Sequence, residues 1–485
     1  MTTSGPSRTR RPRSQPRRFR ARPIPRRWTT YRPPSKLRGE PWLSTRFRRA
    51  LWLWQPWAAL GAWALAVDRF GTASWALPLA VVAYVLRWSE RAPTLGLDHT
   101  APVGSPEFLD TMAGLTGVSF EPGNTVDVLE NGAAYYPAML DAIGRAQASV
   151  TMEQYIFWAG DVADAFAEAF AERARAGISV KLLLDAVGST SLGDRALAVM
   201  KEAGCEVAWY NRIHWYTLGR FNNRTHRKSL IVDGRIGFTG GAGLADHWQG
   251  TASTRDEWRD TQVRVDGPAV RDLQSGFSVN WLRATGEVLQ GHTFFPPLRQ
   301  EGTCDVQIIN SSPDTGASGA RLSYYLAIVS AGRRIDIANP YFIPDEVAVE
   351  TLVEAAARGV QVRVLVTGIH NDNWLARHNS VGLYGILLRG GIKLYEYHPR
   401  MLHQKVMIVD GCWCSVGTSN FDNRSFAHNE ETLLCTCDEQ VVAALSAAFD
   451  NDLAESREVR VEEWRRRGLL ARAQEGIASL LQDQV

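Results

Sequence analysis

The chain has 485 residues, of which 45% are hydrophobic and 22% are charged. This composition is typical of an ordered, core-forming protein and excludes a chain that is disordered throughout. The formal net charge of +3 conceals a division, because residues 1–50 hold sixteen Arg and Lys against the single acid Glu40, which leaves a net charge of −12 for the rest.

Residues 1–49 form an Arg- and Pro-rich segment with few aliphatic side chains. Such a segment cannot bury enough apolar surface to offset the entropy lost on folding, so we expect a disordered basic tail. Its charge either keeps this end of the chain in the cytoplasm or attracts anionic lipid or nucleic acid. The first interpretation is favoured because apolar segments follow at once.

Two apolar runs predict two transmembrane helices within residues 50–88. Residues 50–67 and 70–86 carry no charged side chain, and Asp68 and Arg69 stand between them. At about 1.5 Å per residue each run just spans a bilayer, so we expect a helical hairpin with both ends in the cytoplasm. An export signal is the alternative, but it leaves the second run unexplained. The prediction is a multi-pass protein of the inner (plasma) membrane with a cytoplasmic catalytic region.

After a Pro- and Gly-rich linker, predicted at 89–124, strand and helix patterns alternate. Residues 149–157 are predicted as a strand, 161–177 as an amphipathic helix and 178–188 as a buried strand. The same strand–helix–strand unit recurs at 333–343, 345–359 and 360–368.

The recurrence predicts an internal duplication, because Gly177 and Gly359 lie 182 residues apart and two H-x-K stretches lie 177 residues apart. We therefore expect an α/β fold with two duplicated lobes, at 125–300 and 301–485, each a mixed sheet flanked by helices. Residues 462–485 are predicted as a C-terminal amphipathic helix.

An H-x-K-x4-D motif occurs twice, and a glycine-containing segment follows each copy. The residues are His226, Lys228, Asp233, Gly240 and Gly241 in the first copy, and His403, Lys405, Asp410, Gly417, Thr418 and Asn420 in the second. Lysine is rare in this chain, with six against 48 arginines, yet two of the six stand in these motifs. At positions i and i+2 of a strand, His and Lys project toward one target. The His, Lys and Asp of both copies are the predicted catalytic residues. The Asp-Gly dipeptides are typical of hairpin turns, so within this set each Asp is expected to fix a turn or pair with a cation.

Two imidazoles and two ammonium groups suit the cleavage of a phosphodiester. Cations on the non-bridging oxygens offset the charge that builds in the transition state. A neutral imidazole can attack phosphorus near pH 7 while a protonated one donates to the leaving alkoxide. The six cysteines match no common structural zinc site and are interpreted as small core residues. We expect no metal and no cofactor.

The duplicated motif resembles that of the phospholipase D superfamily over roughly residues 125–460. NRTHRKSLIVDGRIGFTGG, LHQKVMIVDG and VGTSNFDNRS are similar, more narrowly, to bacterial cardiolipin synthases. The resemblance implies that His226 is the nucleophile, forming a phosphohistidine, and that His403 is the general acid and later the base. It implies further roles for the remaining residues: Lys228, Lys405 and Asn420 hold phosphate oxygens, Thr418, Gly240 and Gly241 lie nearby, and Asp260 and Glu431 orient the histidines.

One position departs from the family pattern. The family usually has Asn after the first glycine pair, where this chain has Gly243. The first half therefore lacks one amide donor, which predicts either weaker phosphate binding there or room for a bulkier group.

The resemblance implies a membrane-anchored phosphatidyltransferase that makes cardiolipin from phosphatidylglycerol, with a phospholipid substrate and a membrane as partners. Aromatic segments at 215–221 and 294–297 either seat at the membrane interface or belong to the core. The alternative is a phospholipase D or nuclease-type phosphodiesterase that transfers to water. A nuclease, and a nucleic-acid partner, are disfavoured by the negative charge of the catalytic region. A catalytically silent scaffold is disfavoured because both motifs are intact. The sequence predicts no oligomeric state.

Overall fold

The computed structural model describes residues 54–66, 70–85, 101–212, 223–313 and 318–468, with 474, 475 and 478. The predicted basic tail, the aromatic segment 215–221 and most of the predicted C-terminal helix lie outside these residues.

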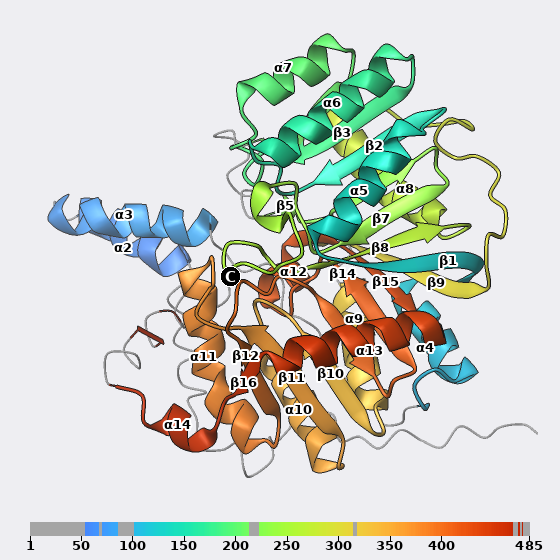
Figure 1. Cartoon of the computed structure of the whole chain (residues 1–485). Helices are drawn as coiled ribbons and strands as arrows, with labels where there is room; N and C mark the ends of the chain where they lie inside the picture. Colours follow the sequence, from blue (N-terminus) through green and yellow to red (C-terminus); the bar gives the residue numbers. More distant parts are fainter. Residues whose placement is uncertain are drawn as a thin grey trace, which may run out of the picture. The chain divides into compact units, whose positions relative to one another are not determined.

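Two apolar helices, α2 (Trp54–Ala66) and α3 (Phe70–Val85), occupy the runs predicted to cross the membrane (Figure 1). They pack on each other, with the rings of Trp57 and Trp75 6.2 Å apart. They are 13 and 16 residues long, and the outer residues of both predicted runs lie outside the described part. Within the described residues, no helix combines the length and the apolar character that crossing a bilayer requires.

Helix α4 (Pro106–Thr116) lies where the sequence predicted a linker. The Ser105 hydroxyl caps its first turn, and Gly117, in the left-handed conformation with φ 71°, ends it. Phe108 and Met112 are buried in the core of the second lobe. The segment is therefore helical because its Ser, Pro and Gly are helix-boundary residues around two side chains that need burial.

Among the described residues, the first lobe contains seven strands of the main sheet, one short strand and five helical segments. They are β1 (Glu121–Glu130), α5 (Gly132–Gly144), β2 (Ser149–Gln154), α6 (Asp161–Arg175), β3 (Ser179–Asp185), α7 (Asp194–Glu202), β4 (Glu206–Tyr210), β5 (Arg224–Thr225), β6 (Ser229–Val232), β7 (Ile236–Gly240), the 3-10 turn η3 (Asp246–Trp248), β8 (Thr261–Asp266) and α8 (Val270–Thr285).

The second lobe repeats this series. Its elements are β9 (Cys304–Ser311), α9 (Gly319–Ser330), β10 (Arg334–Ala338), α10 (Glu346–Ala357), β11 (Gln361–Thr367), α11 (Trp374–Arg389), β12 (Lys393–Tyr397), β13 (Val406–Val409), β14 (Trp413–Gly417), α12 (Asn423–Ala427), β15 (Asn429–Thr436), α13 (Glu439–Ala454), β16 (Ser456–Glu458) and α14 (Val461–Arg465).

The strands form one continuous sheet in which each half mirrors the other. The order β4-β3-β2-β6-β7-β8-β1 in the first lobe matches β12-β11-β10-β13-β14-β15-β9 in the second. In both halves the first three strands are parallel and the rest are antiparallel. Strands β1 and β9 pair antiparallel and join the halves. The predicted mixed sheets and the internal duplication are confirmed.

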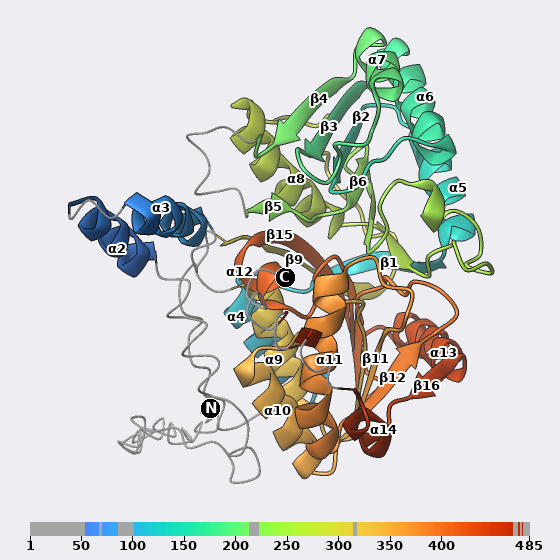
Figure 2. The ribbon, with the colours of Figure 1, turned by 90° about the vertical axis from the view of Figure 1, so that its left-hand side faces the viewer.

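Apolar side chains pack between the sheet and its helices in three clusters. Helices α5, α6 and α7 cover the outer face of the first half, and α9, α10 and α11 cover that of the second (Figure 2). Between the halves, α8 and α13 pack into a core to which both lobes contribute. Separating the lobes would therefore expose the apolar side chains of this shared core to water.

The segment 294–297 packs against the first lobe. Phe294 is buried in the shared core, and its carbonyl lies close to Gly234 in the β6–β7 turn. Of the two interpretations of this segment, core packing is confirmed for Phe294. Helix α14 begins where the C-terminal helix was predicted, but it has only five residues, and Trp464 packs on Gly385 of α11.

The motif aspartates hold hairpin turns. Asp233 and Asp410 have φ of 53° and 55°, and a glycine with positive φ follows each, as the turn type of tight hairpins requires. Backbone N–H groups of residues 147–149 donate to the Asp233 carboxylate at 2.6–3.0 Å, and those of residues 332–334 to Asp410 at 2.7–2.8 Å. Both were predicted among the catalytic residues, but they bind backbone at the far ends of β6 and β13.

We predict that Asp233→Ala lowers the free energy of unfolding by about 2 kcal/mol, because three backbone N–H groups lose their acceptor. Urea denaturation of the full chain measures the effect, and Asp410→Ala should behave alike. Replacing the exposed Asp110 provides the control. Unchanged stability with lost activity would instead assign these carboxylates to the chemistry.

Candidate active site

The two H-x-K motifs come together where the lobes exchange backbone hydrogen bonds. The His226 N–H donates to the carbonyl of Glu430 at 2.9 Å, beside the parallel pairing of β5 with β15. The His403 N–H donates to the carbonyl of Arg259 at 2.8 Å. Glu430 and Arg259 each precede a predicted His-orienting acid, so each histidine is anchored to the opposite lobe.

The imidazoles pair with acids in the same crossed manner. Nδ1 of His226 lies 3.1 Å from both carboxylate oxygens of Glu431, and Nδ1 of His403 lies 2.8 Å from Oδ2 of Asp260. Burial raises the pKa of each carboxyl, but the paired imidazole and the neighbouring lysines more than offset this and lower it. Ionised carboxylates only accept, so Nδ1 donates in both pairs and Nε2 is left with its lone pair.

Further donors hold the two acids. On the second lobe the Thr418 hydroxyl donates to Glu431, and Nδ2 of Asn429 does so at 3.3 Å. On the first lobe Nε1 of Trp248 donates to Oδ2 of Asp260 at 3.0 Å. Each carboxylate is thus satisfied in the buried site, as a buried charge requires.

The predicted glycine pair leaves space for Asp260 and for the strand that follows it. A Cβ on Gly241 would lie 2.2 Å from Oδ1 of Asp260, and one on Gly240 would lie 2.4 Å from the carbonyl of Thr261. These glycines therefore admit the carboxylate and the neighbouring strand. Thr418, which matches Gly241 in the second lobe, also faces its acid.

The ammonium groups lie against the imidazoles. Nζ of Lys228 donates to the carbonyl of His226 at 2.9 Å and lies 5.5 Å from the centre of the Tyr155 ring. Nζ of Lys405 likewise donates to the carbonyl of His403 at 2.5 Å, and it lies 3.0 Å from Nδ1 and 3.1 Å from Nε2 of the same ring. All four motif side chains are buried, and the imidazoles are only 10% and 5% exposed.

The four groups share one electrostatic environment. Burial is the main cause that lowers the pKa of His226 to about 4 and of His403 to about 3, and it lowers the pKa of Lys228 to about 7 and of Lys405 to about 8. The charge of Lys405 further lowers the pKa of His226 and Lys228, and Lys228 lowers that of His403. Each lysine therefore acts on the histidine of the other motif.

The site is asymmetric at the position where the sequence departs from the family. Asn420 is buried on the second lobe, and its Oδ1 has no hydrogen-bond partner among the described residues. On the first lobe a Cβ on Gly243 would lie 2.8 Å from the Trp248 indole and 2.9 Å from Cβ of Ile156. The space predicted at Gly243 is thus filled by the protein's own tryptophan.

Sequence reasoning missed several neighbours of the motifs. The rings of Tyr155 and Tyr341 lie 5.1 Å from His226 and 6.4 Å from His403, respectively. Both tyrosines come shortly after the first strand of the duplicated unit, and this shared location could have identified them. Trp258 also lies near His403, with ring centres 5.4 Å apart.

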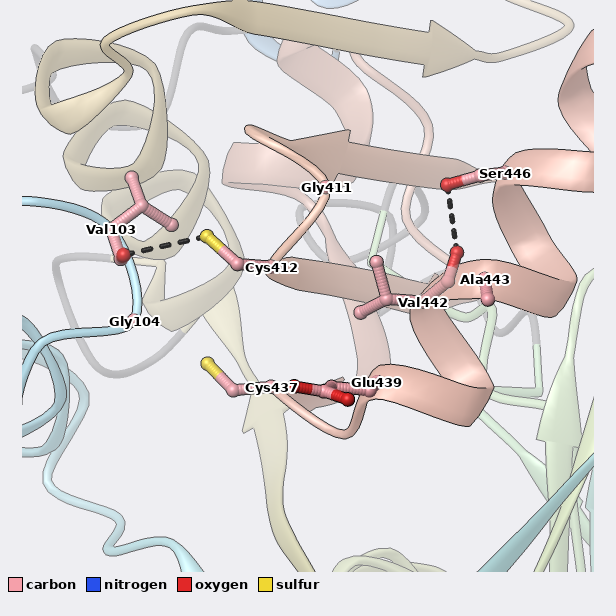
Figure 3. Close-up of a pocket in the computed structure, with 9 residues that line it drawn as sticks. All are labelled: Val103, Gly104, Gly411, Cys412, Cys437, Glu439, Val442, Ala443 and Ser446. Atoms are coloured by element: carbon pink, nitrogen blue, oxygen red, sulfur yellow. Dashed lines mark hydrogen bonds between the residues drawn. The ribbon is translucent and has the colours of Figure 1, made fainter.

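A cavity of about 450 Å³ lies elsewhere, beside the β13–β14 turn (Figure 3). Cys412 and Cys437 line it, and neither imidazole does. All six cysteines are free, and four are buried, as their interpretation as core residues predicted. Burial raises the pKa of Cys437 well above its ordinary value, so the thiol stays protonated. Among the described residues no three His, Cys, Asp or Glu side chains gather to hold a metal ion.

The model of a family described as "Cardiolipin synthase, PLD-like domain" matches residues 139–256 and 325–453. The chain belongs to the phospholipase D superfamily. It is 34% identical over 359 residues to the probable cardiolipin synthase YwiE of Bacillus subtilis, covering 74% of this chain and 71% of the relative. It is 33% identical over 348 residues to cardiolipin synthase A of Pseudomonas fluorescens, covering 70% and 71%. It is therefore an enzyme homologous to the cardiolipin synthases of this superfamily.

A solved structure shares the fold. The phosphatidylserine synthase of Haemophilus influenzae aligns with 78% of this chain and all of its own, with a TM-score of 0.60 and 11% identity. At that identity the likeness concerns the fold alone.

We predict that an anion entering this phospholipase D-type site takes up protons at pH 8. Burial and the charge of Lys405 lower the pKa of Lys228 to about 7, so most of Lys228 is neutral at pH 8, and an anion favours its charged form. Titration calorimetry with sulfate, in buffers of different ionisation enthalpy, measures the uptake. Lys228→Met should reduce it, and the exposed Lys393→Met should not. Proton release, or no proton exchange, would contradict the shared electrostatic environment.

Proposed function

We propose that this protein is a membrane-anchored phosphatidyltransferase that makes cardiolipin and glycerol from two molecules of phosphatidylglycerol. The observation that carries the proposal is the crossed pairing of each imidazole with a carboxylate of the other lobe. The names of the relatives support the lipid substrate.

In the first step Nε2 of His226 attacks the phosphorus, and the bond from phosphorus to the glycerol oxygen breaks. His403 donates a proton to that oxygen, and glycerol leaves. The lobe at 125–300 thereby supplies the nucleophile and the lobe at 301–485 the acid. The contact of Glu431 with Nδ1 supports this role for His226, since it aims Nε2 away from the carboxylate and stabilises the phosphohistidine cation.

In the second step neutral His403 takes the proton from a hydroxyl of a second phosphatidylglycerol, and that oxygen attacks the phosphorus. The phosphorus–nitrogen bond breaks, and neutral His226 is restored. The same proton thus moves in both directions through one imidazole.

The phosphodiester itself prepares His403 as an acid. Burial and the charge of Lys405 hold the pKa of His403 at about 3. A phosphodiester anion held by Lys228, Lys405 and Asn420 offsets the ammonium charges, and Asp260 stabilises the imidazolium that forms. Substrate binding and protonation of the acid are therefore coupled.

Transfer is favoured over hydrolysis by the burial of the reacting groups. The His226 and His403 side chains are 10% and 5% exposed, which limits the access of water to a phosphohistidine. An alcohol brought by a bound lipid has no such disadvantage.

Membrane attachment is assigned to α2 and α3 together with the apolar residues that flank them. Trp63 is 57% exposed and Trp75 46% exposed, although both are large and apolar. Tryptophan at these positions suits the interface of a bilayer. The sixteen basic residues before α2 favour the inner membrane with the catalytic lobes in the cytoplasm.

We predict that the full chain in phosphatidylglycerol vesicles forms cardiolipin and glycerol in equal amounts, as measured by mass spectrometry. His226→Ala should lower turnover by about a thousandfold or more, because no phosphohistidine can form. Phosphatidic acid as the sole product would show hydrolysis, and full activity of His226→Ala would remove the proposed nucleophile.

A further inference from the structure

The acids behind the two imidazoles are held by different donors. Asp260 and Glu431 stand at equivalent positions of the duplicated lobes, and so do Gly241 and Thr418. The Thr418 hydroxyl donates to Glu431, whereas Gly241 has no side chain with which to donate to Asp260. On the first lobe the side-chain donor is Trp248 instead, through Nε1 to Oδ2 of Asp260 at 3.0 Å, and the backbone N–H of Thr261 donates to Oδ1 at 2.8 Å.

The indole is fixed in this position. Trp248 is fully buried. The Tyr135 hydroxyl donates to the backbone carbonyl of Trp248 at 3.2 Å, and the backbone N–H of Trp248 donates to the carbonyl of Ala245 at 3.1 Å. Its ring centre lies 5.2 Å from that of His403. The oxygen it contacts is the one that lies 2.8 Å from Nδ1 of His403. An indole N–H is a donor only and cannot reorient as a hydroxyl can.

Two glycines make this arrangement possible. Gly241 leaves room for the Asp260 carboxylate, since a Cβ there would lie 2.2 Å from Oδ1. Gly243 leaves room for the Trp248 ring, since a Cβ there would lie 2.8 Å from Cζ3. In the second lobe the corresponding residues are Thr418 and Asn420, so the two halves differ at the same two places.

We propose that Trp248 is a positioning residue for His403: its indole N–H holds the Asp260 carboxylate in line with Nδ1, the task that Thr418 performs for Glu431 and His226. This inference rests on the proposed function, in which His403 moves the proton of the alcohol and His226 attacks phosphorus. Trp248 therefore acts on proton transfer and not on the attack.

The test compares two substrates that differ in their need for an acid. Phosphatidylglycerol needs a proton on its leaving oxygen, whereas phosphatidyl-p-nitrophenol releases a leaving group that departs without one. In Trp248→Phe, turnover of phosphatidylglycerol should fall about ten- to hundredfold, because a buried carboxylate loses a charge-assisted hydrogen bond. The first-turnover burst of p-nitrophenol should stay within about twofold of wild type.

Two further variants define the pattern. Thr418→Val should slow the burst as well as turnover, because it acts through Glu431 on the nucleophile. Trp281→Phe is the matched control, because Trp281 is also buried and its Nε1 also donates to a carboxylate, that of Glu287, at 2.8 Å. This variant should change neither the burst nor the turnover.

A second variant displaces the indole without removing it, so the test does not depend on whether Trp248→Phe folds. Gly243→Ala keeps the indole but forces it to move, and it should reduce turnover of phosphatidylglycerol while sparing the burst. If Trp248→Phe and Gly243→Ala slow both substrates equally, or slow neither, Trp248 is not a positioning residue for His403. If the wild-type chain forms no cardiolipin and releases no p-nitrophenol, the proposed function itself fails.

Discussion

The main constraint on this structure comes from two buried carboxylates. Each carboxylate lies on one lobe and pairs with a histidine of the other lobe. Asp260 and Glu431 are both fully buried and ionised, and such groups are strongly destabilising unless each has its donors. Their principal partners are the imidazoles of His403 and His226, across the lobe boundary. Parting the lobes would leave these charges unpaired, so docking of the lobes and assembly of the site are one event.

The surrounding residues reinforce that coupling. Arg227 of the first lobe contacts Glu430 of the second at 2.7 Å, and Arg259 contacts Asp452 at 2.9 Å, with all four side chains buried. Removing one member of a buried ion pair leaves its partner uncompensated. The shared core around α8 and α13 adds a non-directional contribution from apolar burial. The charges therefore set the register of the lobes, and the core supplies much of their attraction.

Duplication gives the site its symmetry. Differences in sequence between the two units give the two imidazoles different surroundings. Transfer through a phosphohistidine needs one imidazole that attacks and one that moves protons, which are different tasks. The units differ at Gly241 and Thr418, and at Gly243 and Asn420. Those positions surround the acids and the proposed phosphate site, where a difference between the imidazoles has the most effect.

Sequence patterns predicted the elements of this fold well where local periodicity decided them. The strand expected at 149–157 is β2, the helix at 161–177 is α6, and the motif aspartates do hold hairpin turns. The crossed pairing was beyond prediction, because it depends on how β5 meets β15 and not on spacing along the chain. Trp248 was missed for the same reason. The region of α4 was misinterpreted because its boundary residues are also those of a linker.

The crossed pairing is tested most directly by replacing each acid in turn with its amide. The measured quantity is the p-nitrophenol burst from phosphatidyl-p-nitrophenol. Glu431→Gln, on the second lobe, should suppress the burst, because Glu431 orients the nucleophile of the first lobe. Asp260→Asn should spare the burst and slow only transfer to the lipid alcohol. The opposite pattern, with Asp260→Asn suppressing the burst and Glu431→Gln sparing it, would mean that each acid serves its own lobe and would contradict the account.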